Sequence, residues 1–181
     1  KKSLKEVVQK YPQHTIAAMA LADLVEISLI EKDGPGKIAL WKTMTFDIPR
    51  EKGAKARNSV RNRLCGDASQ LLANHHFKQL AFDEAVKSLA ATFPEQSLPY
   101  YVYLNSYPVV STFSATVKTK PQSARLADLS IAYIRGRIPT DLKDPQQKTK
   151  ALSYWYHIVE LYSLSRRDNK VLETYGQIAK V

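Results

Sequence analysis

The chain has little cysteine and little glycine. Cys65 is the single cysteine among 181 residues, which excludes an internal disulfide framework and a cluster of thiolate metal ligands. We expect it to pack as a small apolar residue. Six glycines are few for the many tight turns of a β-sandwich or barrel. Because 44% of the residues are hydrophobic and 24% are charged, a packed core remains possible and disorder is disfavoured.

Long apolar runs are also missing. No stretch of about 18 apolar residues occurs, and the longest, residues 16–30, is interrupted by Asp23 and Glu26. The sequence therefore predicts no transmembrane segment. Residues 1–5 lead directly into an amphipathic segment without a signal peptide, which is typical of a trimmed or mature chain. The compartment stays open, cytoplasmic or exported after leader removal, and we expect a piece of a longer protein.

The motifs of catalysis and metal binding are absent. His75 and His76 are adjacent, so on a helix they diverge and do not form the pair that grips zinc. The two glycines of 33–36 lack the form of a phosphate-binding loop and instead predict a turn. No GxSxG motif gives a serine the setting of a nucleophile. We therefore expect no enzymatic activity, no metal and no cofactor.

Apolar residues at every third or fourth position are the strongest signal that is present. Within 51–74, Val60, Leu64 and Ala68 define such a stripe. In the last third, the order Asp144, Pro145 and Gln147 is typical of a helix N-terminus. The expected helices cover 3–10, 14–30, the segment from the 33–36 turn to Ile48, 51–74, 82–94 and 121–136. Two more follow. The first is capped by Asp144 and has Leu152, Trp155, Val159 and Tyr162 on one face, and the last is capped by Asp168 and lined by Leu172, Tyr175 and Ile178.

Segment 97–117 allows two interpretations. Leu98 and Pro99 after Ser97 favour a helix start, and we expect two short helices broken at Pro108. The valines and tyrosines of the segment would also suit a strand. The first interpretation gives an all-α chain of about eight to ten helices joined by short links.

Residues 71–94 resemble a tetratricopeptide repeat. That family has an apolar and small pair in its first helix, matched by Leu72 and Ala73. An aromatic residue followed three positions later by alanine comes next, matched by Phe82 and Ala85, and Pro94 matches the closing proline. The second helix is about one turn shorter here than in the family. Small residues let the two helices approach, and bulky ones fill the gap to the next pair.

Two weaker matches extend the resemblance. One begins at Trp155 and includes Val159, Tyr162 and Tyr175, but Leu172 stands where the family has a small residue. The other covers 11–46. The resemblance implies a right-handed array of antiparallel helix hairpins, a TPR-like α-solenoid, forming a single domain over 1–181 with approximate units 11–46, 54–94, 97–137 and 145–181. Another helical repeat or an irregular bundle is the alternative.

Positive charge dominates, with a formal net charge of +10. This excess favours acidic partners, nucleic acid or anionic surfaces through long-range attraction. The densest run comprises Arg50, Lys52, Lys55, Arg57, Arg61 and Arg63, with Glu51 the single acid within it. Arg57 and Arg61 would share a helix face. The run suits phosphate contacts, an acidic peptide, or simply a solvated face.

A cluster of four tyrosines is the other surplus: Tyr100, Tyr101, Tyr103 and Tyr107. They suit packing between helices or an interface. The family resemblance implies peptide or protein binding in a groove lined by first helices. The candidate binding residues are therefore Arg57, Asn58, Arg61, Lys150, Tyr154 and Tyr101. We expect a scaffold for a protein or peptide partner, and a basic nucleic-acid-binding domain is the alternative. The sequence does not reveal the oligomeric state.

Overall fold

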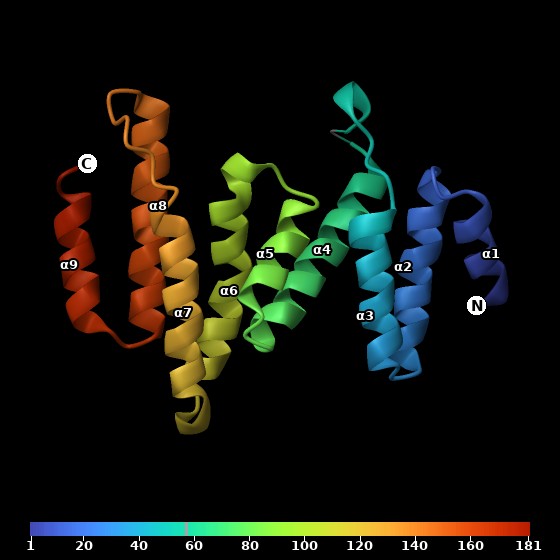
Figure 1. Cartoon of the computed structure of the whole chain (residues 1–181), viewed down its shortest axis with the longest axis horizontal. Coiled ribbons are helices and arrows are strands. Elements are labelled where there is room, and N and C mark those ends of the chain that lie inside the picture. Colours follow the sequence, from blue (N-terminus) through green and yellow to red (C-terminus); the bar gives the residue numbers. More distant parts are fainter. Residues whose placement is uncertain (57) are drawn as a thin grey trace. The chain divides into compact units, whose positions relative to one another are not determined.

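The structure, a computed structural model, describes residues 1–56 and 58–181, without the side chains of residues 54 and 55. No residue of this described part lies in a strand, so the expectation of an all-helical chain is confirmed (Figure 1). The α-helices are α1 (Lys2–Lys10), α2 (Thr15–Ile30), α3 (Gly34–Lys42), α4 (Val60–Lys78), α5 (Phe82–Ala90), α6 (Leu98–Ser114), α7 (Lys120–Arg135), α8 (Pro145–Leu164) and α9 (Asp168–Ile178). A π-helical turn, Thr43–Asp47, extends α3, and short 3₁₀ turns cover Gly53–Ala56, Glu95–Ser97 and Val117–Thr119.

The chain divides into two compact units. Unit 1 comprises residues 1–75 and 83–94, and unit 2 comprises residues 76–82 and 95–181. The backbone therefore leaves unit 1 near the end of α4, returns to it at the start of α5, and leaves it again before α6. No helix of the described chain is long and apolar enough to cross a membrane.

Unit 1 is built on the buried face of α2. The helices α1, α2 and α3 alternate in direction, and α2 packs against both of its neighbours (Figure 1). Small residues on α2 allow this close approach, because Ala17 and Ala18 are fully buried. The core also contains Leu21, Leu24, Val25, Met44, Ile48, Cys65 and Ala68. Cys65 packs within this core as expected.

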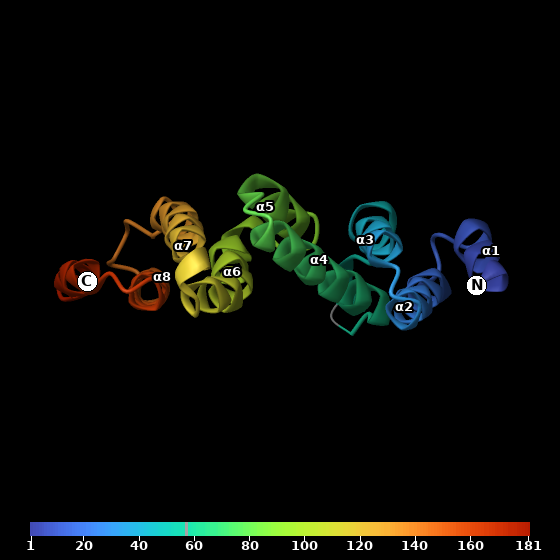
Figure 2. The same cartoon turned by 90° about the horizontal axis from the view of Figure 1, so that it is seen from below.

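Unit 2 is built around α8. The helices α6, α7, α8 and α9 alternate in direction, and α8 packs against α6, α7 and α9 (Figure 1). Figure 2 shows these helices nearly end-on, with α8 beside both α6 and α7. The interface between α6, α7 and α8 contains apolar side chains that are fully buried: Val102, Leu126, Ile134 and Ile158. Burying side chains of this kind stabilises the unit by about 2 kcal/mol each.

Two helices begin at an aspartate that caps them. Asp144 accepts a hydrogen bond from the backbone N–H of Gln146 at 2.9 Å, as the sequence predicted. Asp33 accepts one from Gly36 at 2.9 Å, so 33–36 is the start of α3 as well as a turn. The expected cap at Asp168 is wrong, because Arg167 holds the cap position and Asp168 is the first residue of α9.

Three sequence expectations about helix limits and faces are corrected by the structure. The helix expected at 51–74 begins only at Val60, because Arg50 and Glu51 bond to α4 from outside it. The helix through 97–117 is not broken at Pro108, and α6 continues past it. In α9 the buried residue is Thr174, whereas Leu172 is 71% exposed, so the inner face lies one position away from the expected one.

The continuity of α6 has a packing cause. Pro108 supplies no N–H for the carbonyl of Leu104, which weakens the helix at that point. The residues on either side of it, Val102 and Val110, are fully buried, and α6 packs against both α7 and α8. Tertiary burial therefore outweighs the missing hydrogen bond.

Candidate binding groove

Unit 2 contains a groove of 210 Å³ between the start of α6, the end of α7 and the first half of α8. Its lining residues are Glu95, Gln96, Pro99, Arg137, Lys150 and Tyr154. Lys150 and Tyr154 stand one helical turn apart on α8, so the helix period presents both to the same side. The structure therefore brings together two residues that the sequence singled out.

Tyr154 forms the floor of this groove. It is only 4% exposed, so the expectation that Tyr154 is an outward-facing binding residue of its helix, which followed from its place among the candidate groove residues, is wrong. Its hydroxyl donates a hydrogen bond to the backbone carbonyl of Gln96 at 3.1 Å, which ties α8 to the turn before α6. Burial raises the pKa of this hydroxyl, so Tyr154 stays a neutral donor at physiological pH.

Two cations lie over aromatic rings at the rim. The Nζ atom of Lys150 lies 5.7 Å from the centroid of the Tyr154 ring. The guanidinium carbon of Arg137 lies 3.7 Å from the centroid of the Tyr133 ring, and its Nη1 donates to the Tyr133 carbonyl at 3.3 Å. Neither cation forms an ion pair with a carboxylate of the described residues. The rings hold both charges in place without neutralising them.

Among the groove residues that the sequence analysis missed, Arg137 is the one that a sequence pattern could have indicated. It lies just beyond α7 and follows Tyr133 by four residues, the spacing that also separates Lys150 from Tyr154, although in the opposite order. An aromatic residue and a cation at that spacing were visible in the sequence. Glu95, Gln96 and Pro99 could not be found that way, because only the packing of α6 on α8 brings them to the groove.

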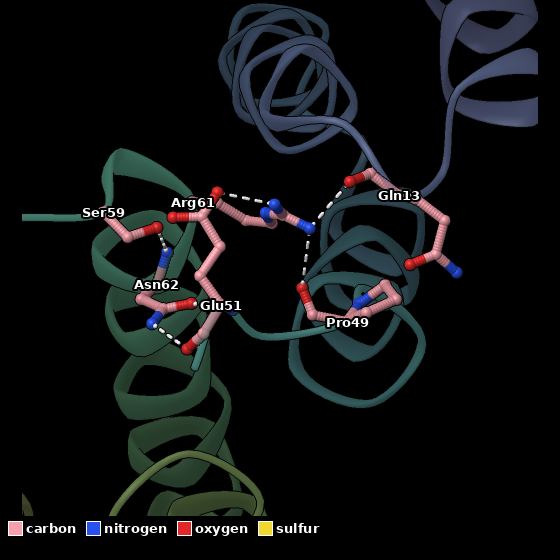
Figure 3. A network of polar contacts seen from close by, with 6 residues as sticks. All are labelled: Gln13, Pro49, Glu51, Ser59, Arg61 and Asn62. Atoms are coloured by element: carbon pink, nitrogen blue, oxygen red, sulfur yellow. Dashed lines mark hydrogen bonds and ion pairs between the residues drawn. The ribbon is translucent and has the colours of Figure 1, made fainter. Parts of the chain in front are cut away.

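The predicted basic run of 50–63 is not a continuous exposed strip. Arg61 is buried, and its guanidinium donates to the carbonyls of Gln13 at 2.8 Å and Pro49 at 3.2 Å. It also forms an ion pair with Glu51 at 2.6 Å. Figure 3 shows Arg61 reaching from α4 to these three residues. A guanidinium engaged in this way holds the chain together and does not face a ligand.

Neighbouring residues complete this network. Asn62 donates to the carbonyl of Glu51 at 3.0 Å and accepts from its N–H at 2.9 Å, a reciprocal pair seen in Figure 3. Arg50 donates to the carbonyl of Thr45 at 3.3 Å and to the hydroxyl of Thr92 at 3.0 Å. The expectation of a solvated helix face is therefore wrong for Arg50 and Arg61.

The other residues predicted in this region have different surroundings. Arg57 lies outside the described residues. Asn58 is exposed and lines a depression of 340 Å³ with Ser59, Val60 and Arg63. Its described lining has one cation, Arg63, and no aromatic side chain. The groove of unit 2, where two cations lie over aromatic rings, is therefore taken as the candidate site.

Tyr101 belongs to an aromatic cluster that joins α6 to α8. Its ring contacts Tyr100 at 5.5 Å between centroids. Tyr103 stacks flat on His157, with centroids 3.9 Å apart and planes 9° apart, and donates its hydroxyl to Glu160 at 2.5 Å. Burial raises the pKa of Tyr103 and lowers the pKa of His157. The sequence grouped the tyrosines but did not connect them to His157 and Glu160, because these lie much further along the chain, Glu160 being 57 residues beyond Tyr103.

Ser153, His157 and Glu160 follow one another along α8 in a triad-like order. The Ser153 hydroxyl lies 3.3 Å from Nε2 of His157, but Nδ1 lies 3.8 Å from Glu160, which is too long for an orienting hydrogen bond. Backbone N–H groups inside a helix are bonded to the preceding turn and cannot form an oxyanion hole. This arrangement does not support nucleophilic catalysis.

The groove offers charge, hydrogen bonds and contact area to a ligand. Its side chains offer two cations, one carboxylate and a fixed tyrosine, with no nucleophile beside a base. Among the described residues, no group of three or more His, Cys, Asp or Glu side chains is placed to hold a metal ion. Comparison of the chain with protein-family models, with curated proteins and with solved structures finds no match in any of the three.

Proposed function

We propose that this chain is a tetratricopeptide-like scaffold that binds an acidic segment of a protein or peptide partner and performs no catalysis. The observation that carries the proposal is the pair of cations, Arg137 and Lys150, at the rim of the groove, which form no ion pair with a carboxylate in the described part of the chain. Cations placed in this way favour carboxylates, and the net charge of +10 attracts an acidic partner from a distance.

The size of the groove favours a peptide side chain over a small molecule. Its 210 Å³ lies below the roughly 300–1,000 Å³ of typical ligand pockets. Tyrosine and arginine are also the residue types enriched in protein interfaces. Because aromatic rings already hold both cations, binding orders fewer side chains and costs less entropy.

The arrangement of helices supports a repeat architecture. In unit 2 the helices alternate in direction, and α8 packs against both helices of the preceding hairpin, α6 and α7. In the segment with the closest family resemblance, Leu72, Ala73 and Ala85 are fully buried, as close packing of a repeat requires. A right-handed superhelix is part of this proposal.

A binding titration with a matched control tests the function. The probe is a fluorescein-labelled peptide of about 12 residues, rich in Glu and Asp around a central Leu, followed by fluorescence anisotropy. We expect Arg137→Glu/Lys150→Glu to weaken binding at least about tenfold, the cost of about 1.4 kcal/mol. The control Lys118→Glu/Lys120→Glu changes two exposed lysines of the same unit and lowers the net charge equally.

Three outcomes are informative. A loss confined to the groove variant supports the proposal. Equal losses in both variants mean that only the overall charge attracts the peptide, and the groove is then not the site. Absence of binding at low salt contradicts the proposal outright.

A nucleic-acid-binding function is the second candidate, and further cation–aromatic pairs in unit 2 favour it. The guanidinium carbon of Arg135 lies 5.9 Å from the Trp155 ring centroid, and that of Arg167 lies 4.9 Å from the Tyr162 ring centroid. However, Tyr154 and Tyr162 are buried, so they offer little ring surface on which bases can stack. A salt titration with an oligothymidine of about 20 nucleotides separates the two functions, because phosphate contacts give a steep salt dependence.

A further inference from the structure

Unit 1 contains a second groove, between α2, the α3–π turn segment and α4. Its volume is 160 Å³, and its lining residues are Ala22, Val25, Glu26, Trp41, Met44, Leu64, Asp67, Ala68 and Leu71. The walls are almost entirely carbon, supplied by aliphatic side chains and the indole of Trp41. The two charged residues in the lining, Glu26 on α2 and Asp67 on α4, are both acidic and both exposed.

The negative charge of these two carboxylates is available to a partner. Lys and Arg number 27 against 17 Asp and Glu, but most acidic side chains of the described residues form no ion pair. Glu31, Asp128 and Glu173 each form an ion pair with a lysine or arginine. Glu26 and Asp67 form none with the described residues. Lys37 does not line the groove, and its Nζ lies over the Trp41 ring at 5.1 Å from the centroid.

Apolar surface is exposed both in the groove and beside it. Leu71, in the α4 wall, is 46% exposed, and Met19, one turn before the groove residues of α2, is 50% exposed. Leu64, Asp67 and Leu71 share one face of α4 by their spacing. A docking segment would therefore meet an apolar floor, apolar flanks and two negative charges at the rim.

We propose that this groove docks a partner segment that inserts an apolar side chain and carries lysine or arginine next to it. The volume fits one or two aliphatic side chains and is too small for a typical cofactor or drug-sized ligand. The apolar walls supply contact area, while Glu26 and Asp67 select for positive charge by complementarity. An amphipathic basic helix presents both features on adjacent positions.

This inference does not depend on the groove of unit 2. The two surfaces have opposite charge, so they favour opposite partners. A chain with both would hold an acidic segment in unit 2 and a basic segment in unit 1. The overall charge of +10 repels a cationic peptide everywhere else, which makes its binding at this groove a stringent test.

The experiment uses two synthetic peptides of about 12 residues with leucine at helical spacing, one with lysine and one with glutamate at the remaining positions. Binding is measured by isothermal titration calorimetry at low salt. We expect the lysine peptide to bind and Glu26→Lys/Asp67→Lys to weaken it at least about tenfold. The matched control is Glu6→Lys/Asp47→Lys, which changes two exposed acids of the same unit and adds the same charge.

A second variant tests the apolar part. Leu71→Ser should weaken the lysine peptide several-fold without adding charge, and circular dichroism confirms that each variant is folded. Equal binding to the wild type and to Glu26→Lys/Asp67→Lys overturns the proposal, as does undetectable binding to the wild type. Equal affinity for a lysine peptide without leucines also overturns it, because the groove would then play no part.

Discussion

At the scale of single residues, Arg61 shows that an arginine within a basic run of the sequence can be buried and hydrogen-bonded inside the fold. Its guanidinium binds two carbonyls and one carboxylate from two separate segments, the turn at Gln13 and residues 49–51. Arginine suits this position because its planar fork offers several donors in fixed directions. The spacing of charges in the sequence could not reveal this role, because the carbonyls that Arg61 meets are set by the tertiary fold.

Removing this guanidinium should destabilise unit 1. Arg61→Ala leaves Glu51 and the carbonyls of Gln13 and Pro49 without their donor, so we expect a loss of about 3 kcal/mol in the free energy of unfolding. Urea denaturation followed by circular dichroism measures it. Arg63→Ala changes an exposed arginine of the same helix and should cost less than about 0.5 kcal/mol. Similar losses in the two variants would mean that the network contributes little.

The candidate groove was partly accessible from the sequence. Lys150 and Tyr154 were named because the tetratricopeptide resemblance implies that the first helix of each pair lines a groove. The burial of Tyr154 was not predictable, since it follows from the bond between its hydroxyl and the carbonyl of Gln96. That contact joins positions 58 residues apart, and a single sequence carries no signal for it.

At the scale of elements, a proline within α6 lowers the stability of that helix. Pro108 is exposed within the helix and deprives the Leu104 carbonyl of its donor. Pro108→Ala should therefore stabilise the chain by about 1–2 kcal/mol, the helix gain minus the greater freedom of the unfolded chain. Thermal unfolding measures the change. Pro121→Ala, in the first turn of α7 where the N–H has no helical partner, should change stability by less than about 0.5 kcal/mol, and destabilisation by Pro108→Ala would contradict this account.

The start of α3 couples two residues. A Cβ atom added at Gly36 would lie 2.0 Å from Oδ2 of Asp33, so Gly36→Ala displaces the capping carboxylate. We expect Gly36→Ala and Asp33→Ala to cost about 1 kcal/mol each, but the double variant to cost less than their sum. A double-mutant cycle by urea denaturation measures the coupling. Strict additivity would show that the cap survives the alanine.

The existence of the helices was easier to predict than their limits and faces. The three-to-four spacing of apolar residues specifies a helix wherever it persists, which is why the all-helical fold followed from it. The face of α9 was missed because Val171 and Leu172 are both apolar and only packing on α8 selects between the two registers. The start of α4 was missed because the polar network keeps 50–51 out of the helix.

At the scale of the whole molecule, pH should act through His157. Its side chain is 14% exposed beneath Tyr103, and burial lowers its pKa below the usual 6.5 against the attraction of Glu160. Between the pKa of the folded state and 6.5, the unfolded chain therefore binds a proton at His157 that the folded chain does not bind. The contribution of neutral His157 to the free energy of unfolding is fully present above pH 6.5. It is lost as the pH falls from 6.5 through the pKa of His157 in the folded state.

We accordingly expect the free energy of unfolding to decrease between about pH 7 and pH 5, with a flatter profile for His157→Phe, which keeps a ring against Tyr103. Urea midpoints collected across this range measure both slopes. The comparison isolates His157 from the carboxylates, which titrate in both proteins. Parallel profiles would show that His157 does not govern the acid sensitivity.

The division of the chain between its two units constrains how they could ever be separated. Residues 76–82 belong to unit 2, although 83–94 return to unit 1. A piece that begins at residue 95 would deprive Tyr133 of Phe82, whose ring lies 6.0 Å away, centroid to centroid. Cutting the backbone at any one position therefore does not separate the two units intact. A continuous fragment that contains all of one unit also contains part of the other.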